Sequence, residues 1–131
     1  MKKLFASAIV FLFFATQGFA FAASVLGKWG VSVEEKGIRY DLSANVKENS
    51  TTFTVACTVA GKTASVTVEI PTKIEDGKIH VLGSGSKEEK VGPIDCKVSI
   101  SPVVYSLEAS DKLLKVTTDR GQIDFLKRLP D

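Results

Sequence analysis

Apolar and polar residues alternate one by one along most of this chain, from Trp29 to Leu126. Successive side chains of a β-strand point to opposite faces of its sheet, so a period of two predicts strands with one buried face. No segment has the period of about 3.6 residues that indicates a helix. We therefore expect an all-β protein. The alternating segments are residues 29–33, 38–46, 53–59, 64–70, 79–81, 94–107, 113–117 and 122–126.

Short turn sequences separate these segments, and they favour tight hairpins between antiparallel neighbours. Eight strands joined mainly by hairpins favour an antiparallel up-and-down eight-stranded barrel, because a Greek-key sandwich needs a long crossover. The longest predicted loop is residues 83–93. A bulge at Ser101-Pro102 is expected to keep residues 94–107 in one strand. The clearest hairpin signals are Lys36-Gly37, Ala60-Gly61 and Asp76-Gly77.

The N-terminal segment has a different composition from the rest of the chain. Lys2 and Lys3 precede an apolar run over residues 4–15, and Ala20-Phe21-Ala22 is a small-x-small cleavage sequence. The apolar run is shorter than the roughly 20 residues that a membrane span needs. We therefore expect residues 1–22 to be a bacterial signal peptide that is removed. Residues 23–131 are then a single β-barrel domain without a transmembrane segment, periplasmic or secreted.

The charge balance argues against two classes of partner. The sequence has 17 basic and 15 acidic residues, and removal of Lys2 and Lys3 leaves the two signs equal. Nucleic acids and anionic membranes are bound through a concentrated positive field that displaces counterions. We therefore expect no nucleic-acid partner. The composition does not identify a protein partner.

Cys57 and Cys96 are the two cysteines of the sequence. Small exported domains meet oxidising conditions and are often stabilised by disulfides, so a Cys57–Cys96 bridge is expected. It would join the third and sixth strands across one mouth of the barrel, at the root of the predicted loop. Closing a loop of this length contributes about 4 kcal/mol in the chain-entropy model. Two buried free thiols are the alternative.

The two ends of the predicted barrel resemble those of the lipocalin superfamily. The first strand reads Leu26-Gly27-Lys28-Trp29 and the last reads Phe125-Leu126-Lys127-Arg128. In lipocalins a G-x-W motif opens the first strand, and an arginine of the last strand packs across the tryptophan. The resemblance implies a small bacterial lipocalin-like (calycin-type) barrel, closed at one end by Gly27, Trp29 and Arg128. A guanidinium over an indole contributes about 1 kcal/mol.

The sequence contains no convincing catalytic or metal-binding group. His80 is the single histidine, and its apolar neighbours Ile79 and Val81 place it on the outer face of its strand. The acidic pairs border turns, where consecutive carboxylates point apart instead of converging across a cleft. We therefore expect no catalytic residue, no metal, no cofactor and no enzymatic activity.

The barrel interior is the remaining candidate site, because eight strands enclose either a packed core or room for one small ligand. The expected lining is aliphatic and uncharged, which suits a small apolar or lipid-like ligand. Tyr40 and Tyr105 would be its polar contacts, with residues 83–93 as a lid. The predicted lining is Tyr40, Leu42, Phe53, Val55, Val66, Val68, Ile79, Val98, Tyr105, Leu114, Val116, Ile123 and Phe125.

A protein-binding module is the alternative function, for instance an envelope inhibitor of a hydrolase such as lysozyme. Such a module would act through its loops, above all through residues 86–90. The size and the two cysteines are similar to those of periplasmic lysozyme inhibitors, but the chain has none of their recognisable motifs.

Overall fold

The computed structural model describes residues 25–130, so the predicted signal peptide lies outside the described residues. Nearly all of the described chain is β-structure, as predicted. Within this range no helix is long and apolar enough to cross a lipid bilayer. The strands are β1 (Gly27–Glu35), β2 (Ile38–Val46), β3 (Ser50–Val59), β4 (Lys62–Glu75), β5 (Lys78–Val81), β6 (Gly85–Val91), β7 (Ile94–Ile100), β8 (Val103–Ala109), β9 (Leu113–Thr117) and β10 (Ile123–Arg128).

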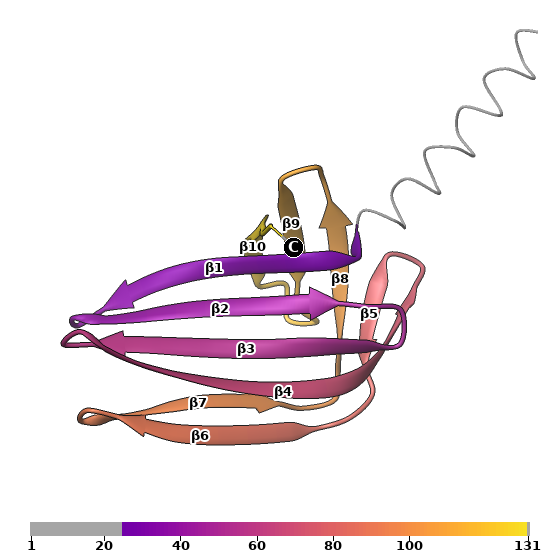
Figure 1. Cartoon of the computed structure of the whole chain (residues 1–131). Coiled ribbons are helices and arrows are strands. Elements are labelled where there is room, and N and C mark those ends of the chain that lie inside the picture. Colours follow the sequence, from indigo (N-terminus) through magenta and orange to yellow (C-terminus); the bar gives the residue numbers. More distant parts are fainter. Residues whose placement is uncertain (1–24, 131) are drawn as a thin grey trace, which may run out of the picture.

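Eight of these strands close into one antiparallel barrel (Figure 1). Their order is β1-β10-β9-β8-β5-β4-β3-β2. Each barrel strand therefore lies beside the barrel strand that precedes it along the chain. Between β5 and β8 the chain leaves the barrel and forms β6 and β7, which pair with each other as a separate hairpin. The predicted closed eight-stranded antiparallel barrel is confirmed, with this hairpin inserted into it.

Three of the predicted turns have positive φ at both central residues. The angles are 54° and 79° at Lys36-Gly37, 51° and 78° at Ala60-Gly61, and 54° and 71° at Asp76-Gly77. Positive φ at both positions is typical of the type I′ turn, whose twist matches that of the flanking strands. These turns join β1 to β2, β3 to β4 and β4 to β5.

The inserted hairpin contradicts two predictions. Residues 83–93 do not form a long loop, because most of them form β6. Residues 94–107 do not form one bulged strand either, since the chain leaves β7 and enters barrel strand β8 at Ser101-Pro102. Proline cannot donate to a strand ladder, and here it separates two strands instead of interrupting one.

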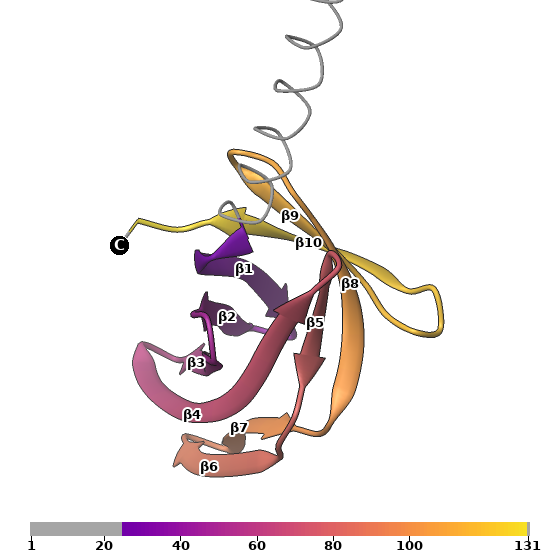
Figure 2. The same cartoon turned by 90° about the vertical axis from the view of Figure 1, so that its right-hand side faces the viewer.

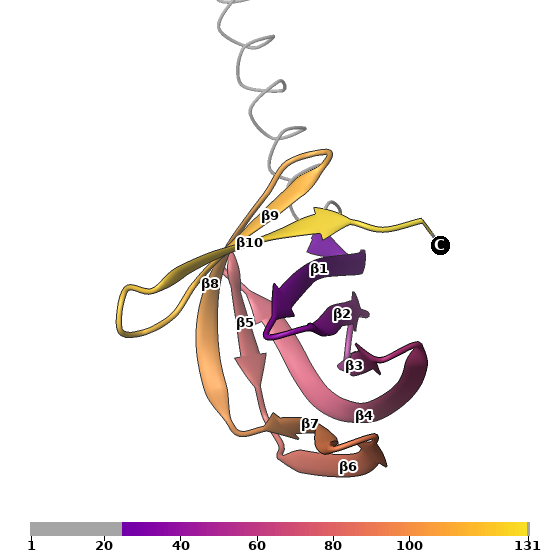
Figure 3. The ribbon, with the colours of Figure 1, turned by 90° about the vertical axis from the view of Figure 1, so that its left-hand side faces the viewer.

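β4 is strongly bent, and its two parts pair with different neighbours. Residues 62–71 pair with β3, and residues 72–75 pair with β5. Figure 2 shows β4 curling between them, and in both Figure 2 and Figure 3 the hairpin lies along β4. The bend divides the apolar core into two clusters. The hairpin cluster is Cys57, Ala64, Val66, Val68, Ile70, Val81, Val91, Cys96 and Val98, and the barrel cluster is Val25, Trp29, Val46, Ile79, Leu107 and Leu114.

A disulfide joins Cys57 of β3 to Cys96 of β7, with 5.8 Å between their Cα atoms. Both side chains are fully buried. The predicted bridge is confirmed, but its predicted course across a barrel mouth is wrong. Cys96 lies in the inserted hairpin and not in a barrel strand, so the bridge fixes the hairpin to the barrel wall.

Candidate binding cavity

The barrel closes where β10 meets β1, through the register pairs Trp29↔Arg128 and Gly30↔Lys127. The Arg128 guanidinium carbon lies 4.1 Å from the centroid of the Trp29 ring, which is a cation–π contact. Trp29 is completely buried, and its Nε1 donates a hydrogen bond to the Val25 carbonyl oxygen at 2.9 Å. The two residues that the lipocalin resemblance pairs are therefore in contact.

Arg128 also connects this closure to the backbone around it. Its Nη1 donates to the Leu26 carbonyl oxygen at 3.2 Å, and its Nε donates to the Asp111 carbonyl oxygen at 3.1 Å. Gly27 has a φ of 120°, and a Cβ added there would lie 3.1 Å from Arg128 Nη1. The glycine of the G-x-W sequence is thus required both by its backbone angle and by the closeness of Arg128.

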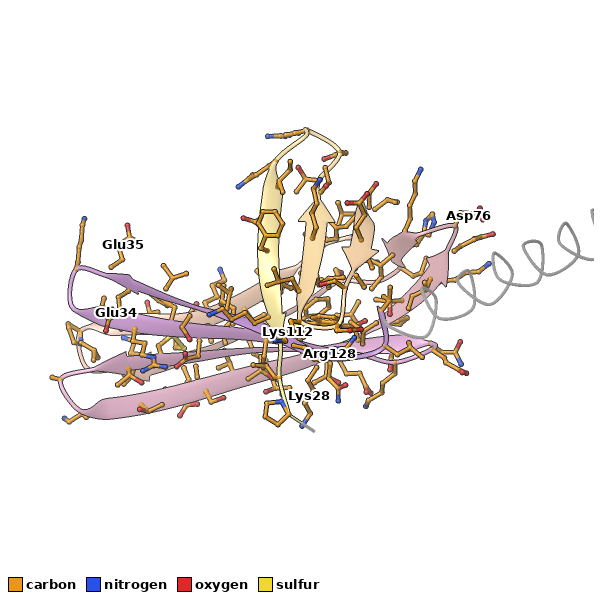
Figure 4. All side chains as sticks on the ribbon, turned by 90° about the horizontal axis from the view of Figure 1, so that it is seen from above. Lys28, Glu34, Glu35, Asp76, Lys112 and Arg128 are labelled. Carbon is orange, nitrogen blue, oxygen red and sulfur yellow. A yellow bond between two sulfur atoms is a disulfide. The ribbon has the colours of Figure 1, made fainter. Side chains whose placement is uncertain are left out.

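Beyond this closure β1 and β10 diverge. Within the described residues, β1 pairs with β10 at Trp29 and Gly30 only, while β2 accompanies it as far as Glu35. Figure 4 shows Arg128 at the crossing, with Glu34 and Glu35 far along β1 from it. In Figures 1 and 4 β10 runs steeply across β1. The divergence leaves a gap in the barrel wall between the two strands.

A cavity of about 280 Å³ lies inside the barrel behind this gap. Its innermost walls include Trp29 and Leu114, which are buried. Its exposed lining residues are Leu42 of β2 and Asp124 of β10. β10 flanks the gap and β2 lies beside β1, its other flank, so these two exposed residues place the mouth of the cavity at the gap. The full lining is Trp29, Leu42, Ser43, Ala44, Val46, Thr51, Phe53, Ile79, Val81, Tyr105, Leu107, Leu114, Val116, Thr118, Asp124 and Leu126.

The polar groups of the cavity differ in their environment. Thr51 of the lining is buried, and its hydroxyl oxygen lies at hydrogen-bond distance, 2.8 Å, from that of the buried Thr72 outside the lining. Thr118 is a half-buried residue of the lining, and its hydroxyl oxygen accepts a hydrogen bond from the Gln122 N–H at 3.0 Å. Asp124 is the single charged residue in that lining. The cavity is therefore apolar at its inner end and acidic at its mouth.

The predicted lining is only partly right. Leu42, Phe53 and Tyr105 line the cavity, together with Ile79, Leu114 and Val116. A second group packs instead in or against the hairpin cluster, because the unpredicted hairpin covers this part of the inner face: Tyr40, Val55, Val66, Val68 and Val98. No residue of β6 or β7 is among the cavity lining, so the predicted lid over residues 83–93 has no counterpart there.

Phe125 and Ile123 were expected inside but face outward, and Phe125 is 56% exposed. Arg128 lies over Trp29 on the inner face, and every second residue of a strand shares a face. Leu126 and Asp124 therefore point inward, while Phe125 and Ile123 point to solvent. Asp124, which lies between the predicted lining residues Ile123 and Phe125, is the charged lining residue that the prediction missed. The signal that would have found it is its distance of four residues from Arg128.

A second hollow, of about 530 Å³, lies on the outer face of β1–β3 beneath the chain end. Ser43 and Ala44 border both hollows, whereas Asn45, Thr52 and Thr54 alternate with cavity residues and so lie on the opposite face of the sheet. Half of the residues that line this second hollow have hydroxyl or amide side chains. The lining is Lys28, Ser43, Ala44, Asn45, Thr52, Thr54, Leu129 and Pro130.

Metal ligands and similarity to known proteins are the two remaining sources of functional information. Within residues 25–130 no group of three or more His, Cys, Asp and Glu side chains is placed to hold a metal ion. No protein-family model, no curated protein and no solved structure matches the chain.

Proposed function

We propose that this protein is an exported, lipocalin-like binding protein that holds a small apolar or lipid-like molecule in the barrel cavity. The cavity behind the β1–β10 gap is the observation that carries this proposal. Ligand sites are concave, mainly apolar and provided with a few polar groups that orient the ligand. The cavity has each of these properties.

The volume limits the ligand to a small one. Ligand pockets commonly measure about 300–1,000 Å³, and 280 Å³ lies just below that range. One alkyl chain of moderate length suits such a volume better than a steroid or a two-chain lipid. Burial of apolar surface contributes about 25 cal/mol per Å² removed from water, so a short chain gains useful affinity.

Two further observations support the lipocalin-like, exported part of the proposal. The eight-stranded barrel joins its first and last strands at Trp29 and Arg128, where the family has its closing contact. The disulfide fits an oxidising compartment such as a periplasm or the cell exterior. We propose binding and not catalysis: the hydroxyls of Thr51 and Thr118 in this lining are hydrogen-bonded to Thr72 and to the Gln122 N–H, and neither partner is a general base.

The test uses Trp29, which is the single tryptophan of the sequence and lines the cavity. Titration with decan-1-ol is expected to change its fluorescence in a saturable manner. Ala44→Phe places a phenyl ring in the cavity and is expected to weaken binding at least tenfold. Ala56→Phe is the matched control, because Ala56 lies on the outer face of the neighbouring strand and is outside the lining.

Both variants must unfold cooperatively for this comparison, and Val116→Phe replaces Ala44→Phe if the latter does not. The proposal fails if decan-1-ol causes no saturable change in the native protein. It also fails if the cavity-filling variant and the Ala56→Phe control bind decan-1-ol equally well.

A protein-binding role is the second candidate, and the inserted hairpin is the observation that favours it. Residues 86–90 are all exposed, and β6 pairs with β7 alone. Replacement of Lys87, Glu88, Glu89 and Lys90 by serine would remove the charges of this strand while leaving the disulfide. Loss of a periplasmic hydrolase from a pull-down with this variant would support the role, and unchanged capture would contradict it.

A further inference from the structure

Asp124 is an unusual residue for the lining of an apolar barrel cavity. It is the single charged side chain in the lining, which contains no Lys, Arg or His. In the described part of the chain Asp124 has no ion-pair or hydrogen-bond partner. The mouth of the cavity thus has a carboxylate with no partner from the protein.

The cavity changes in character from the exposed Asp124 at its mouth to apolar side chains at its inner end, and this direction defines an axis for a ligand. Its register partner on β9 is Val116, and the next inward pair along the same strands is Leu126↔Leu114. Leu114 is buried, whereas Asp124 is exposed. A ligand that lies along this axis meets apolar side chains at one end and a negative charge in water at the other.

We propose that the ligand is a single-chain amphiphile with a cationic ammonium head group, whose tail fills the cavity and whose head lies at Asp124. This inference rests on the proposed binding function and specifies its ligand class. An ammonium group donates hydrogen bonds, and the carboxylate oxygens of Asp124 are acceptors for them. The hydroxyl oxygen of Thr118, in the same lining, accepts one hydrogen bond from the Gln122 N–H and has a second lone pair for another donor.

The same charge distribution disfavours a fatty acid. A carboxylate head at the mouth would face Asp124, and like charges at close range repel. Within the lining no cation is present to compensate that repulsion. A neutral alcohol is neither attracted nor repelled by the charge of Asp124, so its affinity measures the contribution of the tail alone.

The experiment compares three probes that share one tail: decylammonium, decan-1-ol and decanoate, titrated at pH 7 with Trp29 fluorescence. We expect decylammonium to bind most tightly and decanoate most weakly. Asp124→Asn is expected to weaken decylammonium binding about fivefold, the size of one exposed charge pair. The same variant should leave the affinity for decan-1-ol unchanged, which also shows that the cavity is intact.

Asp119→Asn is the matched control, because Asp119 lies in the connection that leads from β9 to β10, is exposed and is outside the lining. It removes an equal charge and is expected to leave all three affinities unchanged. If none of the probes binds, the proposed function itself fails. If all three bind with equal affinity, or if Asp124→Asn and Asp119→Asn have the same effect, the cationic ligand class is wrong and the apolar cavity function stands.

Discussion

Arg128 lies over the ring of Trp29, with 4.1 Å between the guanidinium carbon and the ring centroid, and so joins the last strand of the barrel to the first. The contact coincides with the two register pairs that connect β10 to β1. Because the strands diverge beyond it, this contact both closes one end of the barrel and defines where the cavity opens.

Replacement of Arg128 tests the strength of this closure. Arg128→Ala removes the cation–π contact and the hydrogen bonds to the Leu26 and Asp111 carbonyl oxygens, so we expect the free energy of unfolding to fall by about 2 kcal/mol. Urea denaturation measures this change. Lys127→Ala is the control, since Lys127 is exposed beside it. Equal losses in the two variants would show that Arg128 does not hold the barrel closed.

The stability cost of replacing Gly27 is expected to depend on the presence of the Arg128 side chain. Gly27→Ala strains the backbone and brings a methyl group toward Arg128 Nη1, so it should lower the free energy of unfolding by about 2 kcal/mol. In an Arg128→Ala background the cost should be smaller, because the steric part is absent. Gly61→Ala is the control: Gly61 has positive φ but no atom within 4 Å of an added Cβ. Gly61→Ala should lower the free energy of unfolding by the same amount with and without Arg128. If the loss caused by Gly27→Ala is also the same in both backgrounds, the steric link to Arg128 is refuted.

The Cys57–Cys96 bridge is expected to hold the inserted hairpin in place. Its cysteines are 39 positions apart, so the double replacement Cys57→Ala/Cys96→Ala should lower the free energy of unfolding by about 4 kcal/mol. Amide hydrogens of β6 and β7 should then exchange faster, and by a larger factor than those of β9. Reduced native protein provides the control without mutation. Uniform acceleration over the barrel and the hairpin would argue against a specific anchoring role.

The lowered pKa of Asp41 predicts that part of the protein's stability depends on pH. A hydrogen bond from Ser32, together with Arg39 at 3.2 Å, lowers the pKa of Asp41 against an opposing effect of desolvation. A carboxyl group with a lower pKa in the folded state stabilises the protein above its unfolded pKa of about 3.9 and loses that contribution as the pH falls through the folded pKa. Ser32→Ala should therefore be less stable than the native protein at pH 7, and the difference should vanish in strong acid.

Titration of the Asp41 carboxyl carbon by NMR gives the more direct measurement of that effect. Its pKa should rise toward the ordinary value in Ser32→Ala and stay low in Ser65→Ala, which removes an exposed hydroxyl from β4. An unchanged pKa in Ser32→Ala would show that the hydrogen bond is not the cause.

Much of the barrel was predictable, because its strands have one apolar face and its turns contain residue-glycine pairs. Ala60-Gly61 and Asp76-Gly77 are examples, with positive φ at both residues. β6 was not predictable in this way. Its residues 86–90 are polar or charged and exposed, so no alternation marks them. Pairing with β7, which the Cys57–Cys96 bridge anchors to the barrel wall, makes them a strand.

The cavity was less predictable than the barrel, because its lining depends on the phase of one strand. The alternation of Ile123 and Phe125 suggested that these two residues face inward. The contact of Arg128 with Trp29 imposes the opposite phase and leaves Phe125 in solvent. With this phase Leu126 and Asp124 face inward, and Asp124 enters the cavity lining as a consequence.

The central claim is that an apolar ligand enters this cavity, and intermolecular NOEs between decan-1-ol and protein methyl groups test it most directly. Leu113 and Leu114 are adjacent on β9 but lie on opposite faces, and they are 43% and 2% exposed. We predict NOEs from the alkyl chain to the methyl groups of Leu114, Val116 and Leu126, which line the cavity, and none to Leu113. NOEs confined to Leu113 and Ile123 on the outer face, or a complete lack of NOEs at saturating decan-1-ol, would refute the claim.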